Sequence, residues 1–296
     1  CYPFIYKILK KTNINLLTYS HFLSEKDFKE INKILNSINV NDISSYIHKG
    51  IKIGKHAESG LIRYYCNTDY KNEKNYKVFL KQYFKSALIT YFVSVKMVNK
   101  IKFNHAFFHH GIYIPQGIIC DVLKKKRVSF LTWHPGPRKS TILIAKNDTY
   151  HKFYYDKYPS DWKKNILSKK KITRLETLFH ERKKPKENTW INYQSHNYQN
   201  LKKQFKFYNL NLPGKFVCLF TNVSWDAKLH FGKLTFQDMN EWLDYTINFY
   251  KKSKTNLIIR IHPGEEVGLL KSREPLAKYL LKKIGNSKNI NIIHPH

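Results

Sequence analysis

The chain has 296 residues, 42% of them hydrophobic, and at roughly 150 residues per domain this length is enough for two domains. That composition excludes disordered, collagen-like and mucin-like chains. The net charge of +32 ordinarily points to nucleic acid or an anionic membrane. Only seven of the 53 basic residues are arginine, however, the residue that specific phosphate and base readers favour. We therefore expect a solvated lysine-rich surface and no specific nucleic-acid partner.

No membrane span or secretion signal is expected. The longest apolar run, Ala87–Val95, is too short to cross a bilayer. The N-terminus has lysines where a signal peptide has its apolar core, and it lacks a starting methionine, so we expect the gene to start further upstream. Four scattered cysteines without a CxxC pair indicate neither a zinc ribbon nor a disulfide framework. The expected location is the cytoplasm, with lysine clusters that can hold the protein at the inner-membrane surface.

The first part of the chain predicts two helices and then a βαβ unit. A capping box at Ser24 and Asp27 predicts the start of a helix that reaches residue 38, and apolar spacing predicts a longer helix over 76–95. Short apolar runs at 103–108, 128–133 and 140–145 predict buried parallel strands. Pro115 opens a predicted crossover helix between the first two strands.

Residues 161–212 are dense in charge, and we place there a helical connection between a domain of residues 1–160 and one of residues 213–296. Beyond it, strands are predicted at 216–221, 256–261 and 290–293. One helix is predicted after a cap formed by Thr235 and Asp238, and another over 275–284 with Gly285 after it.

The predicted fold class is α/β, with two Rossmann-like domains facing a cleft. A nucleotide-binding α/β domain usually continues for more units than these, so we expect the second domain to be truncated and to leave apolar faces uncovered.

Polar clusters follow the predicted strands, at the ends where open parallel sheets bind ligands. The first domain has HHG at 109–111 and HPGPRK at 134–139, and the second has NVSWD at 222–226 and HPGEE at 262–266. Asp148 and His151 follow the third strand and are expected at the same rim. A single histidine in such a place often only bonds a loop carbonyl, but four clusters together predict a ligand cleft.

Other site types have no support in the sequence. The histidines show no metal-binding spacing, so no metal and no cofactor is expected. The chain has no GxGxxG, P-loop or GxSxG motif, which argues against a dehydrogenase, a P-loop kinase and an α/β-hydrolase.

Five blocks of the sequence resemble the bacterial capsule polysaccharide biosynthesis proteins. They are HHGIYIPQG (109–117), TWHPGPRKSTILIAKNDTYH (132–151), FTNVSWDAKLHF (220–231), EWLDYTINFY (241–250) and LIIRIHPGEE (257–266). The resemblance implies a GT-B glycosyltransferase that uses a nucleotide sugar, CMP-linked in some relatives that transfer Kdo onto a lipid anchor. It also implies a polysaccharide or glycolipid acceptor, and contact with the inner membrane or the capsule export machinery.

On the donor side, the resemblance places His262 at the donor phosphate, where an imidazole can donate to the departing oxygen. Arg260 is expected to reach the same phosphate or to pair with a carboxylate. Glu265 and Glu266 are expected either to accept from sugar hydroxyls or only to cap a helix. The residues expected to meet the nucleotide are Asn222, Ser224 and Asp226. The Ser/Gly-rich phosphate loop of such families is absent.

On the acceptor side, an inverting transfer needs a group that takes the proton of the attacking hydroxyl. The candidates are His110 and Asp148, ahead of His134 and His151. Arg138 and Lys139 are candidates for holding an anionic acceptor.

Three alternatives to a glycosyltransferase stay open. The first is a non-catalytic polysaccharide-binding or export protein of the same fold, which turnover of a nucleotide sugar would exclude. The second is a nucleic-acid-binding protein, which predicts binding that persists at physiological salt. The third is a sugar-nucleotide enzyme that does not transfer, such as an epimerase.

Overall fold

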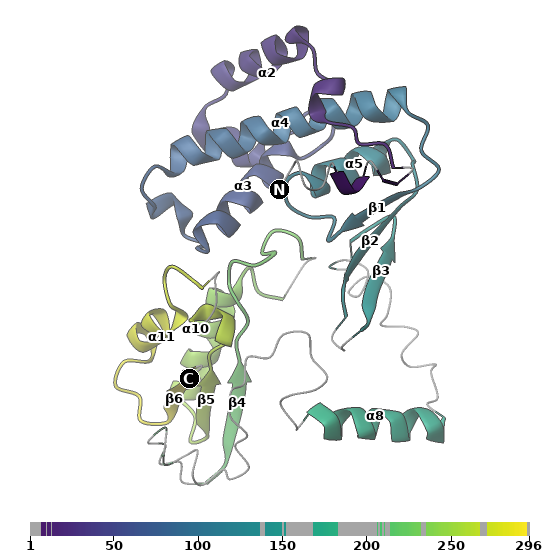
Figure 1. The fold of residues 1–296 in the computed structure, drawn as a ribbon. Coiled ribbons are helices and arrows are strands. Elements are labelled where there is room, and N and C mark those ends of the chain that lie inside the picture. Colours follow the sequence, from purple (N-terminus) through teal and green to yellow (C-terminus); the bar gives the residue numbers. More distant parts are fainter. Residues whose placement is uncertain are drawn as a thin grey trace.

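The computed structural model describes residues 7–9, 11–12, 14–136, 140–149, 151, 168–182, 206, 208, 210, 214–231, 235–266 and 271–294. Within these residues the chain forms a layer of helices and two separate three-stranded sheets (Figure 1). The predicted α/β class is confirmed, while two complete Rossmann-like domains stay a prediction. No helix in the described ranges is long and apolar enough to span a membrane.

The first hundred residues are helical. Helices α2 (Glu25–Ser37), α3 (Ile53–Tyr65) and α4 (Tyr76–Lys100) pack around one apolar core, joined by short 3₁₀ helices at Tyr19–His21, Val40–Ser45 and Tyr70–Asn72. The predicted capping box is confirmed, because the Ser24 amide donates to Asp27 Oδ2 over 2.6 Å. Helix α4 confirms the longer predicted helix and extends it by one turn. Helix α3 is not among the helices predicted from the sequence.

The predicted βαβ unit is confirmed. Strand β1 (Ala106–His109) lies parallel to β2 (Phe130–Pro135), and helix α5 (Gln116–Lys125) connects them. Strand β3 (Ile142–Lys146) runs antiparallel to β2, so the prediction of a wholly parallel sheet is wrong here. The reason is the length of the connection: residues 136–141 alone join β2 to β3, and a parallel crossover needs about a dozen residues or more.

The second sheet is parallel throughout, in the order β4 (Phe216–Phe220), β5 (Asn256–Arg260) and β6 (Ile290–Ile293). Helices α10 (Met239–Lys251) and α11 (Leu276–Ile284) make the two crossovers and contact each other. With sequential strands, right-handed crossovers place both helices on the same face of the sheet. Leu219, Leu257 and Ile259 of the strands form a core with these helices.

The cap of α10 and the exposed side chains of β4 can be compared with what the sequence predicts. Asp238 alone caps α10, by accepting from the Glu241 amide, so Thr235 lies before the helix and not at its cap. The expected uncovered apolar surface is present on β4, where Phe216 is 41% and Phe220 72% exposed.

Helix α8 (Lys169–Arg182) is the described part of the predicted connection 161–212. Its described side chains are mostly exposed, and Figure 1 draws it apart from both sheets. The predicted helical character of this segment is confirmed for α8.

Candidate functional site

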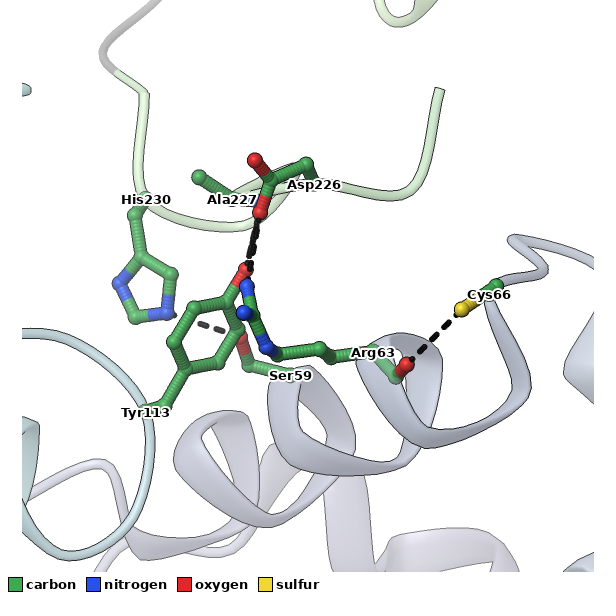
Figure 2. A network of polar contacts seen from close by, with 7 residues as sticks. All are labelled: Ser59, Arg63, Cys66, Tyr113, Asp226, Ala227 and His230. Atoms are coloured by element: carbon green, nitrogen blue, oxygen red, sulfur yellow. Dashed lines mark hydrogen bonds and ion pairs between the residues drawn. The ribbon is translucent and has the colours of Figure 1, made fainter. Parts of the chain in front are cut away.

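The loops that follow β1 and β4 meet at a polar junction (Figure 2). The Tyr113 hydroxyl, from the first loop, donates to Asp226 Oδ1 over 2.8 Å and accepts from the Ala227 amide over 2.8 Å. Arg63, from α3, donates to the same Asp226 oxygen over 3.1 Å and lies over the Tyr113 ring. The loops at the carboxyl ends of β1 and β4 therefore contact each other, while two domains that face a cleft stay a prediction.

This junction changes the expected role of Asp226. Its carboxylate accepts hydrogen bonds from two side chains of the first unit, which comprises α2 to α5 and β1 to β3. Asp226 therefore joins this unit to the second unit, which comprises β4 to β6 with α10 and α11, as well as facing any ligand. Burial raises the pKa of Tyr113 to about 12, and the charge of Asp226 adds to the effect. Tyr113 therefore stays protonated at neutral pH and keeps its hydrogen bond to the carboxylate.

A second contact between the units is buried. Ser59 Oγ and His230 Nε2 lie 2.8 Å apart, and the His230 ring lies 6.0 Å from that of His56 and 6.4 Å from that of His151. Arg63, Ser59 and His56 are not among the site residues predicted from the sequence. A signal was present in HAESGLIRYY, where these three polar residues recur at the spacing of one helix face.

Three histidines gather at the carboxyl ends of β1 and β2. The rings of His109 and His110 are 3.8 Å apart, and that of His134 lies 4.5 Å from His110. His110 has a φ of 59°, the left-handed conformation that non-glycine residues seldom adopt. Burial, and then the neighbouring histidines His109, His134 and His151, lower the pKa of His110 to about 3. Burial also lowers the pKa of His151 to about 4.

Asp148 does not share the surroundings of these histidines. Because β3 is antiparallel, the residues after it start back at the amino end of β2. The Asp148 carboxylate contacts Lys124 Nζ of α5 at 3.2 Å, and its backbone oxygen accepts from Thr132 Oγ1. His151 is 1% exposed, its ring lies 6.4 Å from that of His230, and its charge acts on His110. Arg138 and Lys139 lie outside the described residues.

His262 follows β5 as predicted. Its amide donates to Thr221 Oγ1 over 2.9 Å, and its Nδ1 accepts from the Gly264 amide over 3.0 Å. Since Nδ1 accepts, the proton of the neutral ring is on Nε2. Burial lowers the pKa of His262, which favours that neutral form. This imidazole can therefore donate one hydrogen bond from Nε2.

The two glutamates of HPGEE are both used within the protein. Glu265 is 1% exposed, and its Oε1 accepts from the Ser224 amide over 3.2 Å, so it joins the loops after β4 and β5. Burial raises its pKa. Glu266 lies 3.0 Å from His294 Nδ1. These contacts argue against sugar hydroxyls as the partners of Glu265. Arg260, predicted at the phosphate, ends β5 with its Nη1 buried.

A cavity of about 460 Å³ lies at the carboxyl end of β4, beside the start of α10. The predicted donor residues Asn222, Ser224 and Asp226 line it, and Thr68 from the first unit contributes to its wall. Aromatic side chains of Phe231, Phe236 and Trp242 line it as well. Among the described residues, His262 is not part of this lining. It is connected to the cavity through Gly264, which packs between the His262 ring and Val223, a lining residue.

Within the described ranges, no group of three or more His, Cys, Asp or Glu side chains is arranged to hold a metal ion. The described cysteines, Cys66, Cys120 and Cys218, are free thiols.

Neither the protein-family models nor the curated proteins nor the solved structures include a match to this chain. The likeness to capsule polysaccharide biosynthesis proteins therefore rests on the five sequence blocks, and what it implies is carried forward as a proposal.

Proposed function

We propose that the protein is a glycosyltransferase of capsule or surface polysaccharide assembly that takes its sugar from a nucleotide sugar. The cavity at the carboxyl end of β4 carries this proposal. It lies where open parallel sheets bind nucleotides, and its size is typical of small-molecule sites. The enzyme would act in the cytoplasm, with its lysine-rich surface close to the anionic inner membrane.

The lining of this cavity suits a nucleotide. The rings of Trp242, Phe231 and Phe236 offer faces on which a base can stack. Lys228 also lines the cavity, where its Nζ lies 3.6 Å from Asp238 Oδ2, and we propose that it turns to the phosphates when the nucleotide binds. The Asn222 side chain, whose Oδ1 accepts from the Val223 amide, keeps its amino group for a ligand acceptor.

His262 supports the transfer step. During transfer, the bond between the anomeric carbon and the donor phosphate oxygen breaks, and the acceptor hydroxyl oxygen bonds to that carbon as its proton passes to a surrounding water molecule. Negative charge then develops on the departing phosphate oxygen, to which the Nε2–H group of His262 would donate. His110, with a pKa lowered to about 3, accepts a proton poorly at neutral pH. We therefore propose that His110 forms part of the wall of the junction and is not the base that takes the proton of the attacking hydroxyl.

Binding of nucleotide sugars by calorimetry tests the proposed cavity. A panel of CMP-, UDP- and GDP-linked sugars should contain one that the protein binds and whose affinity falls about tenfold or more in Trp242→Ala, the loss expected when base stacking is removed. Trp133→Ala is the matched control, because Trp133 stacks on Phe107 in the first sheet and is not a lining residue. Equal affinity in the two variants would place the nucleotide elsewhere, and binding without turnover would favour a non-catalytic polysaccharide-binding protein.

A further inference from the structure

Helix α8 differs from the other α-helices of the described residues, each of which buries side chains in a core. Its apolar side chains are exposed instead: Ile172 by 42%, Leu175 by 40% and Phe179 by 65%. None of the three belongs to an apolar core of the described residues. Figure 1 draws the helix apart from both sheets. Apolar side chains that gather in the open on one element mark an interaction surface.

The exposed apolar side chains lie on one face of α8. Ile172, Leu175 and Phe179 follow the i, i+3, i+7 spacing that keeps side chains on the same side of an α-helix, and Leu178 lies beside them. The opposite side of the helix is polar and includes Thr177. The helix is therefore amphipathic, with an apolar face that no other described element covers.

The polar part of α8 is strongly basic. Four residues of 169–180 are basic and one is acidic, which leaves a net charge of +3, and all five side chains are exposed: Lys169, Lys170, Lys171, Arg174 and Glu176. Lysine and arginine on one side of a helix, with leucine and phenylalanine on the other, are typical of helices that lie in a membrane interface. Lys171 falls at the edge of the apolar face, where its long side chain can extend to the headgroups.

We propose that α8 binds the surface of an anionic lipid bilayer, with Ile172, Leu175 and Phe179 inserted at the acyl chains and the basic residues at the lipid phosphates. Its fourteen residues are about 21 Å long, short of the roughly 30 Å of a bilayer core, so the helix lies along the surface. The positive charge selects anionic headgroups. The apolar face needs an apolar interior, which nucleic acid or another soluble polyanion does not offer. The proposal is independent of the nucleotide cavity and stands if the proposed transfer fails.

The first test removes the apolar face and keeps the charge. Sedimentation with vesicles of phosphatidylcholine and phosphatidylglycerol, at physiological salt, compares the full chain with Leu175→Ser and Phe179→Ser combined. The matched control is Tyr245→Ser with Phe249→Ser, an equally spaced exposed pair on α10 that lies near the acidic Glu241 and not among lysines. The α8 variant should lose about tenfold or more in affinity, and the α10 variant should stay within about twofold.

The second test separates α8 from a surface that is lysine-rich everywhere. Lys170→Gln with Arg174→Gln should weaken binding to the same vesicles about tenfold, while Lys81→Gln with Lys85→Gln, on the exposed side of α4, should change it by about twofold at most. Vesicles of phosphatidylcholine alone should bind the unaltered chain much more weakly. Circular dichroism confirms that each variant is folded.

Insertion itself is measured with a tryptophan on each side of α8. Phe179→Trp and Thr177→Trp place the indole on the apolar and on the polar side of the same helix. Vesicles with brominated acyl chains should quench the added fluorescence of Phe179→Trp and leave that of Thr177→Trp nearly unchanged. Equal quenching at both positions, or unaltered binding in the Leu175 and Phe179 double variant, would overturn the proposal. So would a dimer of the unaltered chain that this double variant loses, because a second copy would then cover the apolar face.

Discussion

Lowering the pH from 7 to 5 should destabilise the fold, because the histidines at the junction are buried in their neutral form. Burial is the largest cause of the low pKa of His110, and His109, His134, His151 and Arg63 lower it further. Burial also dominates for His151, where His134 lowers the pKa and Asp226 opposes it. In both cases the folded pKa lies below the unfolded value of about 6.5.

The sign and size follow from proton binding. Between pH 7 and pH 5 the unfolded chain takes up protons at these two histidines and the folded chain does not, so the free energy of unfolding falls with pH. With folded pKa values of about 3 and about 4, each histidine contributes a loss of about 1.9 kcal/mol over this range. Because His110 is partly exposed, solvent screening reduces its share, and we expect a total loss of about 2–4 kcal/mol.

Urea denaturation at the two pH values, followed by tryptophan fluorescence, measures this loss. The double variant His110→Asn with His151→Asn should show much less of it, and asparagine tolerates the left-handed backbone at position 110. Burial raises the pKa of Glu265, so this group makes the fold more stable as the pH falls, opposite to the histidines. Glu265 is present in the unaltered chain and in the double variant, so its contribution is the same in both. His105→Asn, at an exposed position, is the control and should keep the full dependence. The same pH dependence in the double variant as in the unaltered chain would refute the reasoning.

Two substitutions test how the units are held together and packed. Tyr113→Phe removes the hydroxyl that bonds both Asp226 and the Ala227 amide, and should lower the free energy of unfolding by about 1–2 kcal/mol. Tyr64→Phe, at a 51% exposed side chain, is the matched control, and equal small effects would mean that the junction contributes nothing to stability. Gly117→Ala would place a Cβ 2.6 Å from His56 Cε1, so it should lower the melting temperature even though alanine is favoured over glycine in a helix by about 1 kcal/mol. A rise in melting temperature would show that His56 yields easily.

Local signals account for what the sequence predicted correctly. The capping box at Ser24, the proline before α5, and the short apolar runs between turns are all read within a few residues, and the structure confirms the elements they predict. The direction of β3 was also within reach, because residues 136–141 are too few for a parallel crossover.

Non-local contacts explain most of what the sequence analysis missed. Arg63 and Asp226 are 163 positions apart in the chain, and nothing near either residue indicates the other. The burial of Glu265 likewise depends on the loop after β4, which supplies the Ser224 amide. Its neighbour His262 is where the strand and the HPG turn predict it, because that position depends only on β5 and the residues next to it.

One assay decides whether the chain transfers a sugar with the help of His262. Purified protein is incubated with the nucleotide sugar that it binds and with capsular polysaccharide or glycolipid acceptor, and release of the free nucleotide is followed. The proposed function predicts acceptor-dependent turnover, and a fall in kcat of about 10²-fold in His262→Ala with the fold unchanged, the scale of a lost hydrogen bond to a developing charge. No transfer from any donor, or wild-type turnover in His262→Ala, would contradict it.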